Sequence, residues 1–469
     1  MQSSGLAYPI VDSGQIYCYD DGASVACPTE GEGFFGQDAQ YSGNQPSYVD
    51  NGDGTVADLV TGLMWQQDPG EKMTYSEAVA GADNFSLAGY DDWRLPTIKE
   101  LYSLILFSGY DPSGPDASSL VPFIDTDYFV FEYGDESDGE RIIDSQFISS
   151  TEYVSTTMNG ARTVFGVNFA DGRIKGYGTE AMRGQSEGKG FFVLYVRGNS
   201  EYGENDFINN GNGTITDAAT GLTWMQDDNG SGMDWEEALN YCENLDYAGY
   251  DDWRLPNAKE LQSIVDYSRS PDTSNSAAID PLFGVSSITN EAGQTDYPAY
   301  WSSTTHANRR GGMNAAYVNF GRSMGYMNGT WMDVHGAGAQ RSDPKSGDAA
   351  NYPTGHGPQG DAIRIENYVR CVQGGTSGDV VVSGEIDSSI NDSTLPPVGD
   401  NRQAGIGGEP PQEAINACVG SSTGAACTIN TPNGTLDGTC TNIQSELACV
   451  PEGGRPNGGQ QPPAGGGRP

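Results

Sequence analysis

Two stretches of the chain carry the same order of hydrophobic and polar positions. Each opens with short alternating runs around an Asn/Asp/Gly turn, a pattern that is typical of a β-hairpin. Apolar residues then recur at helical spacing, over 75–82 in the first stretch and 235–245 in the second. Thr74-x-x-Glu77 and Asp234-x-x-Glu237 precede these faces as capping boxes. The pattern therefore predicts a hairpin followed by a helix, twice.

A second, shorter helix is expected in each stretch, after Thr97 and after Asn257, because each of these N-cap residues is followed three positions later by Glu. The remaining sequence is punctuated by glycine and rich in aromatic and β-branched residues, which favours antiparallel strands. We therefore predict an α+β fold with two helices and a sheet in each stretch.

The two stretches are an internal repeat, because their motifs recur in the same order. Ala88–Pro96 returns without change as Ala248–Pro256, and the flanking motifs that return are Asn-Gly-x-Gly-Thr, Thr-Gly-Leu-x-Trp, Lys-Glu-Leu, Ser-Ser-Thr, Val-Asn-Phe and Tyr-Val-Arg. Copy 1 is expected over 46–198 and copy 2 over 204–374. Residues 1–45 form a separate N-terminal segment.

The cysteines predict disulfides. Cys242 and Cys371 occur in copy 2, and copy 1 lacks both at the matching positions, Ala82 and Gly198. Their joint absence predicts a Cys242–Cys371 bridge between the first helix and the last strand. Cys18 and Cys27 flank an Asp-Asp-Gly turn and are expected to form a local hairpin bridge.

The C-terminal region predicts a small stapled module over 413–451. Its cysteines are Cys418, Cys427, Cys440 and Cys449. Four cysteines allow three pairings, and the spacing does not choose among them. Disulfides are favoured over a metal site because there is no Cys-x2-Cys pair and no nearby histidine. An acidic linker is expected over 375–412, and a disordered Gly/Pro tail over 452–469.

Composition limits the possible functions. The chain of 469 residues has a formal net charge of −41, which opposes binding to nucleic acid phosphates. No run of residues is apolar enough for a transmembrane segment. Because the cysteines indicate an oxidising compartment, we expect a secreted or cell-surface protein. The sequence would then be that of the mature chain, from which a signal peptide has been removed.

The ordered motifs Asn-Gly-Asp-Gly-Thr, Thr-Gly-Leu-Met-Trp, Asp-Asp-Trp-Arg-Leu-Pro-Thr, Trp-Ser-Ser-Thr and Tyr-Val-Arg-Cys-Val resemble the Lcl C-terminal domain family. That family is named for the C-terminal domain of a bacterial collagen-like adhesin. The Arg-Leu-Pro-Thr motif followed by Glu is also similar to the sulfatase-modifying-factor family. The resemblance implies two tandem C-type-lectin-like domains and an extracellular adhesin that binds glycans. The charge of −41 does not suit sulfated polysaccharides.

Several residue groups are candidate sites. Asp50, Asp53 and Asp58 could bind calcium, or could instead form a hairpin turn. Asp-Asp-Trp-Arg, present in both copies, could hold a ligand or could be a buried Trp beside an Asp–Arg pair. All three histidines lie in the second half of copy 2, which is longer than the matching part of copy 1. The candidate ligand-binding residues there are Trp301, His306, Arg309, Arg310, Trp331, Asp333, His335, Arg341 and His356. A metal held by His335, His356 and Asp333 is the alternative use of this region.

These observations predict a bacterial recognition or adhesion protein that binds glycans or surface proteins through its loops. A structural subunit of an extracellular filament or matrix, with self-association through divalent cations, is the alternative. An enzyme of the sulfatase-modifying-factor type is less favoured, because every cysteine has a candidate bridge partner. A Ser302–His306–Asp333 triad lacks a Gly-x-Ser-x-Gly motif. We therefore expect no catalysis, and no cofactor other than calcium.

Overall fold

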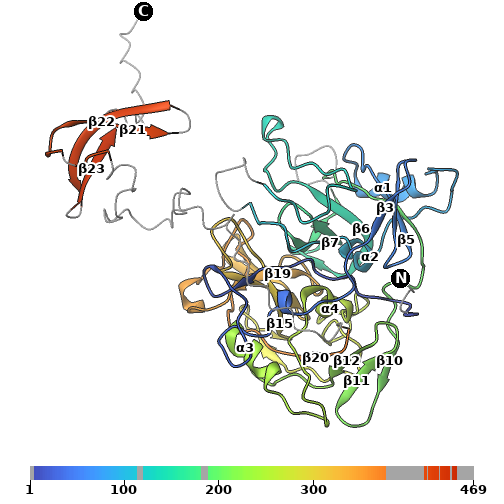
Figure 1. Cartoon of the computed structure of the whole chain (residues 1–469). Coiled ribbons are helices and arrows are strands. Elements are labelled where there is room, and N and C mark those ends of the chain that lie inside the picture. The colour runs from blue at the N-terminus through green and yellow to red at the C-terminus, as the bar shows by residue number, and fades with distance from the viewer. Residues whose placement is uncertain are drawn as a thin grey trace, which may run out of the picture. The chain divides into compact units, whose positions relative to one another are not determined.

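The computed structural model describes residues 5–112, 120–180, 189–375, 417–419, 421–431, 434–443 and 446–451. The chain divides into two compact units, residues 1–396 and 397–469 (Figure 1). The first unit contains the N-terminal segment and both sequence repeats, and the second contains the four-cysteine module. The two predicted repeats thus share one compact unit.

Repeat 1 contains a four-stranded sheet, two helices and a three-stranded meander. The sheet, in the order β3-β4-β5-β9, consists of β3 (Tyr48–Asp50), β4 (Thr55–Asp58), β5 (Leu63–Gln66) and β9 (Val196–Gly198). The helices are α1 (Tyr75–Ala82) and α2 (Ile98–Tyr102). The meander is β6 (Gln146–Thr157), β7 (Ala161–Asn168) and β8 (Arg173–Gly178).

Repeat 2 has the same elements and two additional hairpins. Its four-stranded sheet consists of β10 (Phe207–Asn209), β11 (Thr214–Asp217), β12 (Leu222–Met225) and β20 (Val372–Gln373). Its helices are α3 (Trp235–Glu243) and α4 (Ala258–Ser263), and its larger strands are β15 (Ala299–Thr305), β16 (Asn314–Asn319) and β19 (Gln340–Pro344). The hairpins are β13 (Ile288–Thr289) with β14 (Thr295–Asp296), and β17 (Met324–Met327) with β18 (Thr330–Asp333).

The helices begin where the capping residues predict. Thr74, Thr97, Asp234 and Asn257 each accept a hydrogen bond from the backbone N–H of the Glu three positions later, and each Glu side chain bonds back to the cap. Each capping box satisfies backbone donors that the first helical turn leaves without partners. The prediction of two short helices in each repeat is therefore confirmed.

The two repeats share one six-stranded sheet, in the order β15-β16-β19-β8-β7-β6. β8 lies beside β7 with Ile174 opposite Val167, and β19 lies beside β16 with Gln340 opposite Val318. Ile174 and Gln340 then pair with each other, antiparallel. Because equivalent positions meet in an antiparallel pair, the repeats are related by an approximate two-fold axis at this pair. One hydrophobic cluster accordingly includes Trp65 of repeat 1 and Trp224 of repeat 2.

The N-terminal strap, residues 5–45, packs against both repeats. Its hairpin, β1 (Cys18–Tyr19) with β2 (Ser24–Val25), is closed by the predicted Cys18–Cys27 disulfide. A 3-10 helix (Asp38–Gln40) follows, and Tyr41 then donates a 2.6 Å hydrogen bond to Glu243 on α3. The spacing of the cysteines predicted the bridge but not this packing, because the contacts join residues about two hundred positions apart.

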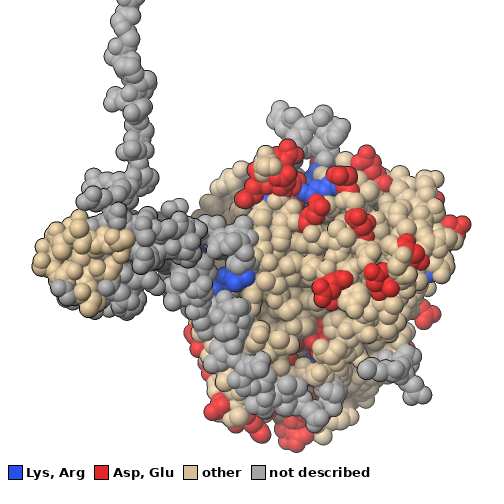
Figure 2. Space-filling view, turned by 45° about the horizontal axis from the view of Figure 1, so that its top comes forward, with Lys and Arg blue, Asp and Glu red and all other residues tan. Residues whose placement is uncertain are grey.

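Acidic side chains dominate the surface, and several bases lie inside. Figure 2 shows Asp and Glu scattered over the visible face, with few Lys or Arg among them. Within the described ranges, seven Lys and Arg side chains are buried, at positions 175, 254, 259, 322, 341, 345 and 370. Each buried base needs an internal acceptor, because an unpaired buried charge is costly. At least seven of the 23 bases thus lie in the interior, and the surface is left strongly negative.

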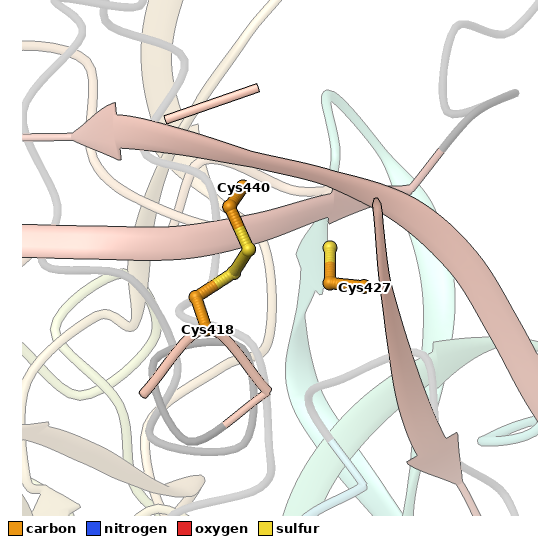
Figure 3. Close-up of side chains that lie close together, drawn as sticks. All are labelled: Cys418, Cys427 and Cys440. Carbon is orange, nitrogen blue, oxygen red and sulfur yellow. A yellow bond between two sulfur atoms is a disulfide. The ribbon is translucent and has the colours of Figure 1, made fainter. Parts of the chain in front are cut away.

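The C-terminal module is a three-stranded antiparallel sheet of β21 (Ala426–Thr431), β22 (Gly434–Ile443) and β23 (Glu446–Pro451). Cys418 forms a disulfide with Cys440, and the sulfur of Cys427 lies near this bridge (Figure 3). Cys427 is also disulfide-bonded, and no cysteine in the described part of the chain is free. These sulfurs lie within 4.8 Å of one another, but disulfide formation removes the thiolates that a metal would need. The module is stapled by disulfides, as predicted.

Candidate functional site

The predicted ligand-binding residues of copy 2 do not converge on one surface. Trp301 is fully buried, and its indole N–H donates a 3.0 Å hydrogen bond to the carbonyl of Met233. The buried group also includes His306, Asp333, His335 and Arg341. Arg309, Arg310 and Trp331 are half-buried, whereas His356 is exposed beside Tyr352. The prediction that these residues form one binding loop is not supported, because most of them pack inside repeat 2.

The buried histidines have internal partners. His335 Nε2 lies 3.2 Å from Asp361 Oδ1, and Arg341 pairs with the other oxygen of the same carboxylate. Arg341 and His335 hold the pKa of Asp361 well below its usual range, against the effect of burial. His306 stacks on Phe123 with ring centroids 5.4 Å apart, and burial lowers its pKa to about 4. These contacts explain why rare residue types gather here without forming an open site.

Asp333 fixes a turn beside repeat 1. Its Oδ1 accepts hydrogen bonds from the N–H groups of Ser323 and Gly336, at 3.2 and 2.8 Å. Tyr153 of β6 donates a 3.0 Å bond to Oδ2, and burial raises the pKa of Asp333 to about 7. In the described residues, neither Asp333 with His335 and His356 nor any other His, Asp or Glu set is grouped to hold a metal.

The serine triad is not assembled. Ser302 Oγ donates to the carbonyl of Ala316 at 2.7 Å, and His306 Nε2 lies 2.9 Å from the carbonyl of Asp171. The Asp333 carboxylate has the separate partners just described. All three side chains thus serve as internal hydrogen-bonding groups.

Asp50, Asp53 and Asp58 close turns. Asp50 Oδ1 accepts from the N–H of Gly52, and Asp53 Oδ1 accepts from both the N–H and the hydroxyl of Thr55. Asp58 is buried on β4, and its Oδ1 accepts from two N–H groups that follow it. The described residues contain no cluster of these carboxylates, so the hairpin-turn alternative fits and the calcium prediction is not supported.

The Asp-Asp-Trp-Arg motif is structural in both repeats. Trp93 and Trp253 are buried, and each indole donates to a backbone carbonyl six residues earlier. The arginines pair with the glutamates of the capping boxes, Arg94 with Glu100 and Arg254 with Glu260. The buried-Trp alternative is therefore correct, but the predicted partner of the arginine, an aspartate of the motif, is wrong.

A pocket of about 440 Å³ lies between the two repeats. We call it the inter-repeat pocket. It lies between the start of α2 and the segment that follows α4, and the connection between the repeats forms one wall. Its lining is Thr97, Ile98, Lys99, Thr151, Tyr202, Gly203, Glu204, Asn205, Phe207, Ile264, Val265, Asp266, Tyr267, Ser268 and Asp280. No sequence motif pointed to this site, because its residues come from both repeats and from their connection.

The polar groups of the pocket are held in place. Lys99 Nζ donates to the carbonyl of Gly203 at 3.0 Å and to Asn205 Oδ1 at 2.7 Å, and burial lowers the pKa of Lys99 to about 8. Tyr267 donates its hydroxyl to the carbonyl of Gly338 at 3.0 Å. The Asp266 carboxylate accepts from the N–H and the hydroxyl of Ser268. Hydroxyl, carboxylate, ammonium and aromatic groups thus share one fixed cavity, which suits a polar ligand.

Glu204 and Asp280 make the pocket acidic. Glu204 is exposed and Asp280 is half-buried, and with Asp266 they bring three carboxylates to a lining that contains one ammonium group, that of Lys99. Such an excess of one charge in a concave site attracts ligands of the opposite charge. The pocket is therefore better suited to a cationic or neutral ligand than to an anion.

The predicted long-range disulfide is confirmed. Cys242 on α3 is bonded to Cys371, which directly precedes β20. Among the described residues, no helix has the length and apolar character needed to cross a membrane.

Comparison of the sequence with known families finds both repeats. Residues 54–197 and 213–335 each match the Lcl C-terminal domain family, and together they cover more than half of the chain. Comparisons with curated proteins and with solved structures found no match. The two matched stretches correspond to the two repeats that share the six-stranded sheet. The chain therefore belongs to the Lcl C-terminal domain family, of which it carries two tandem copies.

Proposed function

We propose that the protein is a bacterial recognition or adhesion protein of the cell exterior, which binds a polar surface ligand in the inter-repeat pocket without changing it chemically. The observation that carries this proposal is the pocket itself, a cavity of about 440 Å³ whose polar lining is fixed by internal hydrogen bonds. Fixed donors and acceptors favour binding because little ordering is needed when the ligand arrives.

The disulfides support an extracellular location. Three bridges join Cys18–Cys27, Cys242–Cys371 and Cys418–Cys440. Such bonds persist in oxidising environments and are rare in the cytosol. The acidic surface seen in Figure 2 suits a protein that remains dispersed while it meets a partner of positive or no charge.

The ligand would be a glycan or a polypeptide of a surface. Sugars are held by hydroxyl and carboxylate hydrogen bonds together with aromatic contacts, and Tyr267, Phe207 and Asp266 supply these groups in the pocket. The C-type-lectin-like fold that the sequence suggests belongs to this proposal and would add to the case for sugars. The same groups can also bind a peptide backbone.

Affinity electrophoresis, in which a polymer held in the gel slows the migration of a protein that binds it, tests the proposal. The full chain would be run through gels that contain neutral polysaccharides, acidic polysaccharides, or gelatin as an unfolded polypeptide. The blocking variant is Glu204→Trp, because Glu204 is exposed on the pocket wall and can be replaced without disturbing the core. Arg141→Gln, at an exposed base outside the pocket lining, is the matched control. We expect at least one polymer to retard the parent and the control but not the blocked variant. Equal migration of all three proteins in every gel would refute the proposed function.

A further inference from the structure

The approximate two-fold axis gives the inter-repeat pocket a counterpart on the other side of the unit. The pocket lies between the start of α2 and the segment after α4, so its counterpart lies between the start of α4 and the segment after α2. Matching hydrogen bonds confirm the equivalence. The N–H of Ile98 bonds to Thr151 Oγ1 at 2.9 Å, and that of Ala258 bonds to Thr304 Oγ1 at 2.9 Å. Lys259 is accordingly the counterpart of Lys99.

The counterpart site is filled by the N-terminal strap. Lys259 Nζ donates to the carbonyl of Asp12 at 2.9 Å, and the N–H of Phe107 donates to the carbonyl of Ser13 at 2.7 Å. The side-chain amide of Gln15 bonds to both the N–H and the carbonyl of Thr305, at 2.8 and 2.7 Å. The protein thus shows how an irregular polypeptide segment, with Gly14 at φ +73°, occupies a site of this design.

A second part of the strap reaches the threonine of the counterpart site. Thr304 Oγ1 donates a 2.5 Å hydrogen bond to Asp38 Oδ2, while the same oxygen accepts from the helix. The strap therefore supplies backbone carbonyls to a lysine and to an N–H group, and a side-chain oxygen to a hydroxyl.

The equivalent donors belong to residues that line the inter-repeat pocket. Tyr267 is the counterpart of Phe107, because Asp266 and Leu106, which precede them, make matching 2.9 Å bonds to Ala278 and Phe123. Within the described part of the chain, the Tyr267 N–H and the Thr151 hydroxyl donate to no acceptor. Lys99 lines the same cavity. We propose that the inter-repeat pocket binds a polypeptide segment of a partner protein, in the manner in which the strap fills the counterpart site.

The differences between the two sites indicate a basic side chain in this segment. Gly14 of the strap lies against Leu106, since a Cβ on Gly14 would be 3.1 Å from Leu106 Cδ2. In the inter-repeat pocket the counterpart of Leu106 is Asp266, and Glu204 and Asp280 lie on the same lining. A lysine or arginine at the position of Gly14 would meet these carboxylates, and the net charge of −41 would attract it from a distance.

Peptides copied from the strap test this inference, which rests on the proposed function. The probes are fluorescein-labelled peptides of residues 8–17 in which Gly14 is replaced by Lys or by Glu. Because Gly14 has φ +73° in the strap, both replacements carry the same backbone cost, and the two probes differ in charge. Their anisotropy is followed on titration with the full chain. The wild-type strap fills its own site, so the free peptide would enter the inter-repeat pocket. We expect saturable binding of the Gly14→Lys peptide and at least about tenfold weaker binding of the Gly14→Glu peptide.

Protein variants assign the binding to the pocket. Glu204→Lys should lower the affinity for the Gly14→Lys peptide about tenfold, since it reverses one of the charges that attract the basic side chain. Thr151→Val should lower the affinity for both peptides about fivefold, because the hydroxyl donor is lost. Arg141→Gln should leave the affinity for both peptides unchanged. Thermal unfolding would confirm that each variant is folded. The inference is overturned if the affinity of the peptides is unchanged by Glu204→Lys and by Thr151→Val, or if neither peptide binds.

The gel assay separates this inference from the proposed function. Polysaccharide retardation that Glu204→Trp abolishes, together with no peptide binding, would leave the proposed function standing and refute a polypeptide ligand. Failure of both assays would refute both.

Discussion

Replacing Arg254 by Met should cost more stability than replacing Arg94, although the two arginines occupy the same place in the two repeats. Both guanidinium groups hold a glutamate through two bonds, at 2.6 and 2.6 Å to Glu260 and at 2.6 and 2.5 Å to Glu100. The Arg254 side chain is 5% exposed, whereas that of Arg94 is 34% exposed. Part of the difference comes from the strap, because the ring of Tyr41 lies 5.5 Å from the Arg254 guanidinium.

The expected losses follow from this difference in exposure. Removing one partner of a buried ion pair leaves the other charge buried and costs about 3–5 kcal/mol. Arg254 also donates a 2.7 Å bond to the carbonyl of Gly374, which its loss would leave unpaired. For Arg94→Met we expect about 1–2 kcal/mol, because water can reach Glu100 once the half-exposed side chain is gone.

Urea unfolding followed by tryptophan fluorescence measures both losses. With a slope of about 3 kcal/mol/M, a difference of about 2 kcal/mol separates the two midpoints by about 0.7 M. The double variant Arg254→Met/Glu260→Met should recover part of the loss, since it removes the unpaired carboxylate. Full recovery is not expected, because Glu260 also accepts a 2.9 Å bond from the N–H of Asn257. Equal losses in the two repeats, or a loss below about 1 kcal/mol for Arg254→Met, would refute this reasoning.

Two further predictions concern the disulfides and His306. Replacing the Cys242–Cys371 pair by Ser should cost about 5 kcal/mol and the Cys18–Cys27 pair about 3 kcal/mol, because the closed loops span 129 and 9 positions. Thermal unfolding of the two double variants tests the order, and a reversed order would contradict the loop argument. The buried His306 has its pKa lowered to about 4 from an ordinary 6.5, so between these values only the unfolded chain gains the proton. Stability should therefore fall as the pH falls through this window, by about 3 kcal/mol in total. The stability difference between wild type and His306→Gln should shrink accordingly, and a difference independent of pH would exclude this role.

Local signals in the sequence predicted local structure well. The capping boxes fixed where the helices start, since a cap depends on residues only three positions apart. The Cys242–Cys371 bridge was also predictable, although its cysteines are far apart, because the repeat offered a comparison in which both are missing together. The hairpin turns at Asp50 and Asp53 depend on neighbouring N–H groups and were present as an alternative to calcium.

The candidate site could not be predicted in this way. Residues such as His335 and Arg341 were selected because they are rare and lie in a long segment, but rarity does not distinguish a binding loop from a buried ion pair. Their burial depends on the position of β19, which the β17–β18 hairpin separates from β16 along the chain. The pocket needed a further piece of information, namely that the two repeats pack around a shared sheet and enclose a cavity between them.

The strap makes two related sites unequal. In a pair of repeats with two-fold symmetry, the lysines at the starts of α2 and α4 would face equivalent cavities. The strap fills one cavity, buries Lys259 and brings Asp38 to Thr304, whereas Lys99 on the other side is held by the connection between the repeats. A segment that covers one site contributes to the stability of the unit, and the site that stays open is available for a ligand. The residues that differ between the two sites, above all Asp266 in place of Leu106, are consequently where specificity should be sought.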